Sequence, residues 1–597
     1  MQNIKKLSNL LTSKERLRVI FLLFMILIMA LIDMLGIASI MPFIAILANP
    51  ELIESNNILN SMYEIATNFG IKTEKRFLFA MGVVVFLLLI TSISFKALTL
   101  YFQTRFIKMC QFNIGTRLVK HYLYQPYSWF LNQNSATLGK AILSEVGNVV
   151  GKGLTPMMNL ITNIVIIFTI FVLLVLVEPK LAGIVLLTMC TFYGLVYKFN
   201  RNLLTKIGEE IFLANEKQFN ILSEAFGASK EIKVGGLEEI YINQFSEPSK
   251  KIALHTALLT IMSEMPRYTL EAVAFGGMLL ITLYFMTLSS DITNVLPIIA
   301  LYAFAGYRLM PALQKIFSSL TSLRFVTPSL DSLHNELKNL KFIVPNKNID
   351  PLELNNDICL RDIQYNYPKA SKTALKKINL VIPINKTIGL VGATGSGKTT
   401  TVDIILGLLD AQEGSLEVDG KVINKNNKRA WQRSIGYVPQ QIFLSDNTVS
   451  ANIAFGVNIN DINQEAVEHA AKIANLHEFV INELPLKYQT IVGERGVRLS
   501  GGQRQRIGIA RALYHKPKVL ILDEATSALD NLTEKAVMNA IHNSEDNITK
   551  ILVAHRLSTV RYCDNIFLFD KGELINQGTF EELIKINDDF RKSAENN

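Results

Sequence analysis

The sequence predicts a bundle of membrane-spanning α-helices fused to a separate α/β domain. Three observations support this fold class. Hydrophobic residues make up 49% of the 597 residues and the mean hydropathy is +0.27, which is too apolar for an ordinary soluble protein of this length. Long apolar runs occupy the first half of the chain. In the second half, short β-branched runs alternate with helical ones.

Six runs are long and apolar enough to cross a bilayer, which takes about 20 helical residues. Six such runs make buried core helices of a soluble protein a poor alternative. The connections between the second and third runs, and between the fourth and fifth, are long, amphipathic and free of strong breakers. We therefore expect helices that continue well beyond the membrane. The six runs are 19–46, 77–101, 155–177, 181–197, 269–286 and 293–313.

Changes in composition predict the division of the chain. Residues 1–18 are expected to form a basic cytoplasmic leader, and residues 19–335 the transmembrane domain. A polar, Asn-rich stretch marks a linker at 336–355, and the α/β domain follows at 356–597.

The first loop between spans has a helical pattern of its own. Ile58, Met62, Ile65 and Phe69 recur at helical spacing and predict an external amphipathic helix over about 52–69. Two interpretations are open for it, a helix on the membrane surface and a loop helix packed on the bundle.

The charges predict the orientation of the chain. Residues 105–154 contain six Lys or Arg and one acid, whereas the first external loop is rich in Glu. Because basic loops stay inside, we expect a multi-pass inner-membrane protein whose N-terminus and C-terminal domain are cytoplasmic. The net charge of +9 suits such loops, and no nucleic-acid partner is expected. The four cysteines are scattered, which supports neither a disulfide framework nor a zinc site.

A glycine-rich motif, GATGSGKT, follows an apolar strand and opens a helix, which is the context of a phosphate-binding P-loop. Lys398 is expected to reach the β- and γ-phosphates of ATP, and Thr399 to bind Mg²⁺. The predicted ATP-binding residues of this loop are Gly392, Ala393, Thr394, Gly395, Ser396, Gly397, Lys398, Thr399 and Thr400.

Two further motifs follow the P-loop. VLILDE is a buried strand that ends in two acids, where Asp523 would bind Mg²⁺ and Glu524 would act as general base toward water. LSGGQ places a serine N-cap and two glycines at the start of a helix. It resembles the signature motif of ATP-binding cassette proteins and consists of Leu499, Ser500, Gly501, Gly502 and Gln503.

With this series of motifs, nearly the whole chain resembles an ATP-binding cassette exporter of the six-span half-transporter type. The resemblance implies a homodimer with two ATP sites, each joining the P-loop of one subunit to the signature motif of the other. It implies that Tyr367 stacks on adenine, that Gln440 contacts Mg²⁺, and that His555 reaches the γ-phosphate. It also implies Glu494 in an exporter-type loop, and coupling helices at about 124–132 and 225–231.

Charged residues inside the spans bear on the cargo, because such groups are costly in a membrane. Internal ion pairing is the alternative for any one of them. The runs LIDMLGIASIMPFIAIL, SFKALTLYF, EMPRYTLEAVAF and YRLMPA resemble the lipid-linked oligosaccharide flippases of bacterial protein N-glycosylation. That resemblance implies that Lys96, Arg267 and Arg308 engage the diphosphate of a polyprenyl carrier. A lipid, lipid-A or multidrug exporter, and an ATP-gated channel or regulator, remain alternatives.

Overall fold

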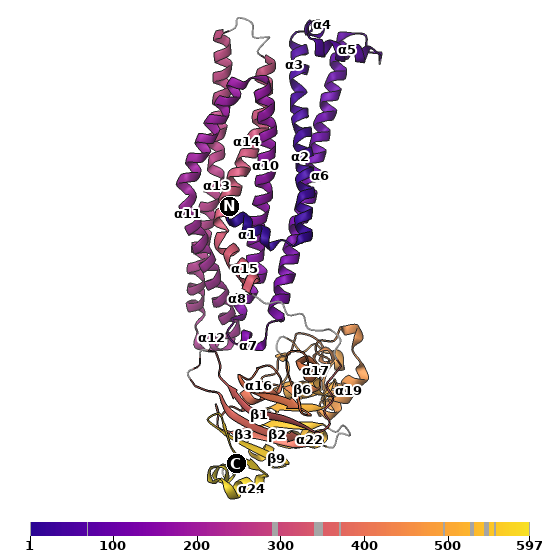
Figure 1. Cartoon of the computed structure of the whole chain (residues 1–597), viewed down its shortest axis with the longest axis vertical. Helices are drawn as coiled ribbons and strands as arrows, with labels where there is room; N and C mark the ends of the chain where they lie inside the picture. The colour runs from indigo at the N-terminus through magenta and orange to yellow at the C-terminus, as the bar shows by residue number, and fades with distance from the viewer. Residues whose placement is uncertain are drawn as a thin grey trace. The chain divides into compact units, whose positions relative to one another are not determined.

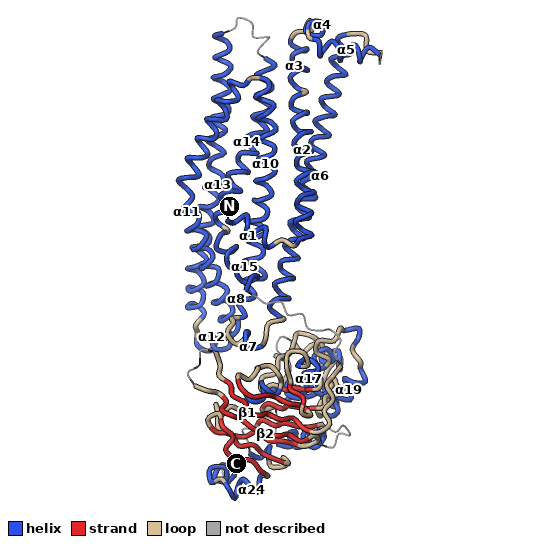
Figure 2. The backbone as a smooth tube through the Cα atoms, viewed as in Figure 1, coloured by secondary structure: helices blue, strands red, loops and turns tan. Residues whose placement is uncertain are grey.

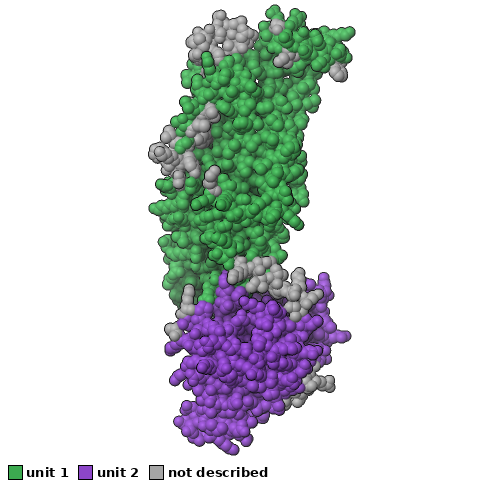
Figure 3. Space-filling model, viewed as in Figure 1, with its two compact units in different colours: residues 1–125, 132–343 green, residues 126–131, 344–597 purple. Residues whose placement is uncertain are grey.

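The computed structural model describes residues 2–68, 70–288, 296–339, 350–368, 370, 372–493, 496–525, 531–542, 548–554 and 557–595. The chain divides into two compact units, coloured separately in Figure 3. Unit 1 comprises Met1–Gln125 and Asn132–Ile343, and unit 2 comprises Pro126–Leu131 and Val344–Asn597.

The described part of unit 1 is helical (Figure 2). Its α-helices are α1 (Gln2–Leu10), α2 (Ser13–Ala38), α3 (Ile40–Ala48), α4 (Leu52–Ser55), α5 (Asn57–Asn68), α6 (Glu74–Leu123), α8 (Ser135–Lys140), α9 (Val146–Val149), α10 (Thr155–Val177), α11 (Pro179–Gly227), α12 (Ser229–Gly235), α13 (Glu238–Leu288), α14 (Leu296–Phe325) and α15 (Thr327–Asn339). Two π-helical segments, Ala141–Glu145 and Val150–Leu154, flank α9.

Three helices of unit 1 are much longer than a membrane is thick. α6 has 50 residues, α11 has 49 and α13 has 51. At a rise of about 1.5 Å per residue each is about 75 Å long, against about 30 Å of hydrocarbon. The prediction of helices that extend far beyond the membrane is confirmed.

Among the described residues, three helical stretches are long and apolar enough to span a membrane: Ser13–Ala48, Glu74–Leu123 and Ser135–Val177. They contain the first three predicted spans. The other three predicted spans lie in α11, α13 and α14, where the side chains of many residues, or the residues themselves, lie outside the described part.

Apolar side chains hold the helices of unit 1 together. Figure 1 shows α2 and α6 running side by side, with α4 and α5 near their ends. Met29 and Ile37 of α2 are buried against Ile170 of α10 and Leu301 of α14. The core of unit 1 therefore lies along α2, α10 and α14.

The external helix predicted at about 52–69 corresponds to α4 and α5. Leu59 packs with Phe77 of α6 in a small apolar cluster. Met62 and Ile65, which belong to the predicted apolar face, are 44% and 59% exposed. The side chains of Ile58 and Phe69 lie outside the described part.

Unit 2 contains all the described strands, drawn in red in Figure 2. The strands are β1 (Asp357–Tyr365), β2 (Leu375–Pro383), β3 (Thr387–Gly392), β4 (Glu413–Val418), β5 (Lys421–Val422), β6 (Ile435–Val438), β7 (Val519–Asp523), β8 (Thr549–Val553), β9 (Asn565–Asp570) and β10 (Glu573–Gly578). The helices are α7 (Tyr127–Phe130), α16 (Lys398–Ile405), α17 (Lys428–Arg433), α18 (Val449–Ile453), α19 (Gln464–Ile473), α20 (His477–Glu483), α21 (Gly501–Leu513), α22 (Asn531–His542), α23 (Leu557–Val560), α24 (Phe580–Ile586) and α25 (Asp588–Glu595).

Two sheets form the centre of unit 2. One is antiparallel with the order β2-β1-β4-β5, and the other has the order β10-β9-β3-β8-β7-β6. In the second sheet only β10 is antiparallel to its neighbour. β7 and β8 are buried at every position, as expected for parallel strands covered on both faces. The carboxyl ends of β3, β6 and β7 therefore meet at one edge.

Candidate functional site

The loop between β3 and α16 contains the predicted phosphate site. Gly392 has φ +153° and Gly397 has φ +107°, angles that other residues rarely adopt. A Cβ atom on Gly392 would lie 2.2 Å from the carbonyl oxygen of Phe569, and one on Gly397 would lie 2.7 Å from Cδ2 of Leu375. Glycine at these two positions therefore lets the loop curl tightly before the N-terminus of α16, where backbone N–H groups favour anions.

Lys398 is the first residue of α16, and its side chain turns back over the loop. Its ammonium group donates hydrogen bonds to the carbonyl oxygens of Gly392 at 2.7 Å and Ala393 at 3.0 Å. Burial lowers the pKa of Lys398, while the carboxylates of Glu524 and Asp523 act in the opposite direction. The lysine charge is thus held at the centre of the loop.

Two polar residues follow the parallel neighbours β6 and β7. Gln440 lies just beyond β6 and donates a hydrogen bond of 2.8 Å from its side-chain amide to the Glu524 carboxylate. Glu524 directly follows β7 and has φ +50°, a left-handed conformation that strains a residue with a Cβ atom. The structure therefore brings the predicted base and the predicted glutamine into contact.

Asp523 ends β7 and is 5% exposed. Burial raises the pKa of Tyr437 on β6, and the nearby Asp523 carboxylate, with which it forms a hydrogen bond, raises it further. The tyrosine hydroxyl thus stays protonated and holds this carboxylate in place.

Tyr367 lies beside the start of α16. Its hydroxyl is 3.1 Å from the Thr400 hydroxyl, and its ring meets the Tyr365 ring edge-on at a centroid distance of 5.1 Å. An aromatic face is therefore fixed next to the phosphate loop.

One cavity of about 550 Å³ joins these side chains. Of the predicted residues, Gly392, Ala393 and Asp523 do not line it, although the first two accept the hydrogen bonds of Lys398. Ala374 lines it and was not predicted, because an alanine carries no chemical signal. The full lining is Tyr367, Ala374, Thr394, Gly395, Ser396, Gly397, Lys398, Thr399, Thr400, Gln440 and Glu524.

The LSGGQ residues begin α21. Ser500 is its N-cap: its hydroxyl accepts a hydrogen bond from the Gln503 N–H at 3.2 Å, and its own N–H donates one to the Gln503 side-chain oxygen at 2.7 Å. None of the five residues lines the phosphate cavity of this chain. His555 and Glu494, also predicted for the ATP site and its surroundings, lie outside the described residues.

A second cavity, of about 250 Å³, lies among the helices of unit 1. α6 and α10 each line it with residues at the i, i+3, i+4 and i+7 positions that share one helix face. The residues are Lys96, Thr99, Leu100 and Gln103 of α6, Asn159, Thr162, Asn163 and Ile166 of α10, Met29 and Asp33 of α2, and Tyr307, Arg308, Pro311, Ala312 and Lys315 of α14.

Positive charge exceeds negative charge in this cavity. Its lining has three cations, Lys96, Arg308 and Lys315, against one carboxylate, Asp33. Asp33 is already engaged, because Arg308 lies 3.3 Å away and Ser92 donates a hydrogen bond of 2.7 Å to it. Within the described part of the chain, neither Lys96 nor Lys315 has a carboxylate at ion-pair distance.

The structure groups the predicted cargo residues only in part. Lys96 and Arg308 share the cavity, but Arg267 lies on α13, is 55% exposed at its side chain and pairs with Glu271 at 2.8 Å. Lys315 was missed, although it follows Arg308 by seven residues and so shares its helix face.

Family comparisons agree with this arrangement. Residues 375–527 match the family model of the ABC transporter, and residues 18–312 match that of the ABC transporter transmembrane region. The heterocyst differentiation ATP-binding protein HepA of Nostoc sp. is 30% identical over 507 residues, which cover 84% of this chain and 82% of that protein. The chain belongs to the ABC transporter family.

Other relatives of this ABC exporter half-transporter span both units. The ATP-dependent lipid A-core flippase of Saccharophagus degradans is 29% identical over 491 residues, which cover 81% of this chain and 82% of the flippase. A solved bacterial Atm1-family ABC exporter with ATP bound matches the fold with a TM-score of 0.76 at 20% identity, covering 97% of each chain. The exporter thus pairs a transmembrane helical domain with an ATPase domain.

The donor set of the exporter fits nucleotide-bound Mg²⁺. Such an ion takes one or two protein ligands and otherwise phosphate oxygens and water. Thr399, Gln440 and Asp523 supply hydroxyl, amide and carboxylate oxygens, which are the hard ligands that Mg²⁺ prefers.

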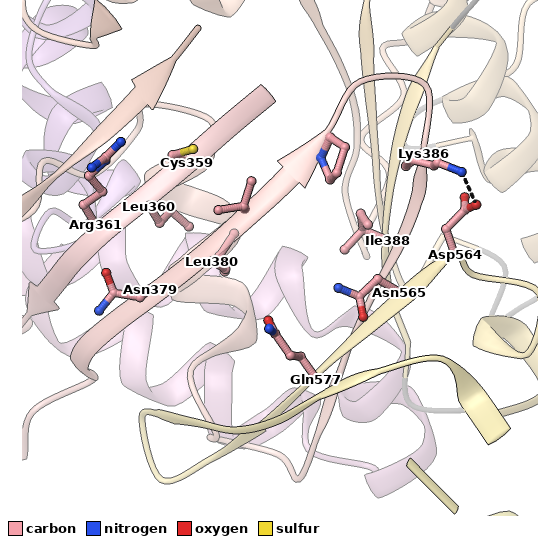
Figure 4. Close-up of a pocket in the computed structure, with 12 residues that line it drawn as sticks. Cys359, Leu360, Arg361, Asn379, Leu380, Lys386, Ile388, Asp564, Asn565 and Gln577 are labelled. Carbon is pink, nitrogen blue, oxygen red and sulfur yellow. Dashed lines mark hydrogen bonds and ion pairs between the residues drawn. The ribbon is translucent and has the colours of Figure 1, made fainter. Parts of the chain in front are cut away.

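The ATPase unit also has a shallow groove away from these residues (Figure 4). It lies between β1, β2 and the β9–β10 pair, and the Lys386–Asp564 ion pair of 2.9 Å borders it. It contains none of the predicted site residues, and we assign it no role.

Proposed function

We propose that this exporter flips a polyprenyl-diphosphate-linked oligosaccharide across the inner membrane, driven by ATP hydrolysis. The observation that carries this proposal is the excess of cations in the unit 1 cavity. Lys96 and Lys315 have no carboxylate at ion-pair distance among the described residues, so the cavity has positive charge to spare and favours an anionic ligand. The planar guanidinium group of Arg308 can donate two parallel hydrogen bonds to phosphate oxygens, and the ammonium groups of the two lysines add compact positive charges.

The depth of the cavity supports a lipid headgroup as that ligand. Lys96 is 22 residues after Glu74, the first residue of α6. At about 1.5 Å per residue this places Lys96 about 33 Å along the helix. A hydrocarbon layer is about 30 Å thick, so Lys96 would lie near its cytoplasmic boundary, where headgroups enter.

The roles in the nucleotide site are part of the proposal. The P-loop amides and Lys398 bind the ATP phosphates, and the Tyr367 ring stacks on adenine. Thr399, Gln440 and Asp523 hold Mg²⁺, which would neutralise phosphate charge when bound. Glu524 takes a proton from the attacking water, and His555 contacts the γ-phosphate.

The proposal also includes a homodimer with its ATPase domains in the cytoplasm. The signature residues do not line the phosphate cavity of their own chain, which supports a site completed by the partner subunit. The basic connections at 105–154 support the orientation.

Lipid-stimulated ATPase activity tests the cargo. Purified wild type in nanodiscs should be stimulated by a polyprenyl-diphosphate glycan and not by a neutral glycolipid. Replacing Lys96 and Lys315 with Met should raise the half-saturating lipid concentration about tenfold or more, because charge-assisted hydrogen bonds to the diphosphate are lost. Stimulation that is unchanged in this variant would contradict the role of the cavity.

A second candidate cargo is a lipid A-type phosphoglycolipid. The similarity to a lipid A-core flippase, which covers 81% of this chain, favours it. The same assay decides between the two, because lipid A should then stimulate at a lower concentration than the polyprenyl-diphosphate glycan.

A further inference from the structure

We propose that a row of amide side chains in the unit 1 cavity binds the first sugar of the cargo, beside the diphosphate. The row consists of Gln103 on α6 and Asn159 and Asn163 on α10. This inference rests on the proposed function: the cations bind the diphosphate of the cargo, and the amides bind the sugar attached to it.

The three amides are linked, and two of them are buried whereas Asn159 is half-buried. Gln103 is 4% exposed and Asn163 is 6% exposed. The Gln103 amide donates to the Asn159 side-chain oxygen at 3.1 Å, and the Asn163 amide donates to the Asn159 backbone carbonyl at 2.7 Å. These bonds fix the positions of the amides on two different helices.

The row keeps unused hydrogen-bonding capacity. Each amide has two N–H donors and one oxygen acceptor. Within the described residues, the Asn159 amide nitrogen, Gln103 Oε1 and Asn163 Oδ1 have no protein partner, and all three residues line the cavity. Either orientation of each side-chain amide leaves both donors and acceptors facing the cavity.

This mixture identifies the ligand class. A phosphate group only accepts hydrogen bonds, so amide oxygens would repel it, whereas sugar hydroxyl and acetamido groups both donate and accept. The neighbouring Thr99 and Thr162 hydroxyls donate to carbonyl oxygens of their own helices, at 2.9 Å and 3.0 Å, and so present acceptors to the cavity. The mixture of donors and acceptors in this wall therefore suits a sugar.

The arrangement along α6 separates the two halves of the ligand. Gln103 follows Lys96 by seven residues on the same helix face, which is about 10.5 Å along the axis. The diphosphate would lie beside Lys96 and Arg308. The sugar would lie further along the cavity, beside the amides and Lys315, which follows Arg308 by the same seven residues on α14.

Equilibrium binding of radiolabelled lipids to the full-length protein in nanodiscs tests this assignment. The probes are polyprenyl diphosphate and polyprenyl-diphosphate N-acetylhexosamine. The variants are the near-isosteric Asn159→Leu and Gln103→Met, with Lys96→Met as the matched variant of the cationic half. Size-exclusion profiles and melting temperatures identify variants that fold.

Wild type should bind the sugar-bearing lipid about tenfold more tightly than the bare diphosphate, the gain expected of one or two net hydrogen bonds. Each amide variant should reduce this advantage to about twofold or less while its affinity for the bare diphosphate stays unchanged. The inference is overturned if wild type binds the two lipids with equal affinity, and this comparison does not depend on the folding of any variant. It is also overturned if the amide variants weaken both lipids equally.

Failure of the proposed function would look different. In that case wild type would bind neither lipid, or the cationic variant would bind bare diphosphate as tightly as wild type.

Discussion

At the scale of single residues, the contact between Gln440 and Glu524 places a strained carboxylate at the mouth of the phosphate loop. Glu524 has a left-handed backbone, and its carboxylate accepts the hydrogen bond of the Gln440 amide. Strain of this kind is kept where the surroundings fix it, and it is frequent in active sites. This position agrees with the proposed role of Glu524 as the general base.

Glu524→Gln should reduce ATP hydrolysis by about 100-fold or more, because a general base typically contributes a factor of this size. ATP binding should persist, since the P-loop is unchanged. Phosphate release and nucleotide binding by the purified variant measure the two effects. Glu573→Gln, which removes only an exposed pair with Lys376, is the control and should hydrolyse ATP normally. Near-normal turnover by Glu524→Gln would exclude this residue as the base.

Residues were predictable from the sequence where the chemistry requires a motif. The P-loop, Gln440 and Glu524 lie where their motifs indicated, because strand–loop–helix geometry follows from local sequence. The amide row could not be predicted, because Gln103 and Asn159 belong to helices that meet only in the folded bundle. Ordinary polar residues in an apolar run carry no signal until their neighbours are known.

At the scale of elements, two π-helical segments interrupt the long helix that runs from Ser135 to Val177. The first places the Lys140 ammonium 3.4 Å from the Glu145 carboxylate and 3.8 Å from the centre of the Phe212 ring. Residues five apart in an α-helix lie about 140° apart around the axis, so this pair depends on the π turn. The pattern of apolar residues predicted the helix but not this change of hydrogen bonding.

The buried ion pair leads to a prediction. Lys140→Met should lower the free energy of unfolding by about 3–5 kcal/mol, because it leaves Glu145 buried without its charge partner. Lys140→Met/Glu145→Leu should recover most of that loss. Denaturant unfolding in detergent measures the cycle. Lys217→Met, which breaks the exposed pair with Glu247, should change little. A double variant less stable than Lys140→Met would contradict this explanation.

A second element, the turn after β4, anchors the chain that enters the ATPase domain. The Asp419 carboxylate accepts hydrogen bonds from the backbone N–H groups of Asn355, Asn356 and Asp357 at 2.8, 2.7 and 3.1 Å. Burial acts to raise the pKa of Asp419, but these bonds outweigh it and hold the pKa below its ordinary value. Its stabilising contribution is therefore present above the ordinary pKa and is lost as the pH falls through the folded value.

Asp419→Ala should consequently lower the melting temperature near neutral pH, and the difference from wild type should shrink as the pH falls below the ordinary aspartate pKa toward the lower folded value. Thermal melts across this range check the sign. A difference that grows with acidity would contradict the anchoring role.

At the scale of the whole molecule, motif order and apolar runs were enough to predict the two-unit architecture. The exporter fold could be predicted because the nucleotide-binding motifs and the apolar runs are both clear and occupy separate parts of the sequence. The cargo site is harder to predict, because it arises where α2, α6, α10 and α14 meet. Arg267 is an example: its sequence run resembles that of the flippases, but the residue does not line the cavity and pairs with Glu271.

The proposed dimer predicts complementation between subunits. A heterodimer of one Lys398→Ala subunit and one Ser500→Arg subunit keeps one P-loop facing one intact signature motif. It should occlude one nucleotide, whereas each parent homodimer should occlude none. Nucleotide trapping on differently tagged, co-purified subunits provides the measurement. Occlusion by the Ser500→Arg homodimer at the wild-type level would argue against a shared site.

ATP-dependent flipping of a fluorescent polyprenyl-diphosphate glycan in proteoliposomes tests the central claim most directly. The wild type should move the lipid between leaflets with ATP, and Glu524→Gln should not. The variant with Lys96, Arg308 and Lys315 all changed to Ala should lose flipping while it keeps basal ATP hydrolysis. Wild-type rates of flipping in that variant would contradict the account.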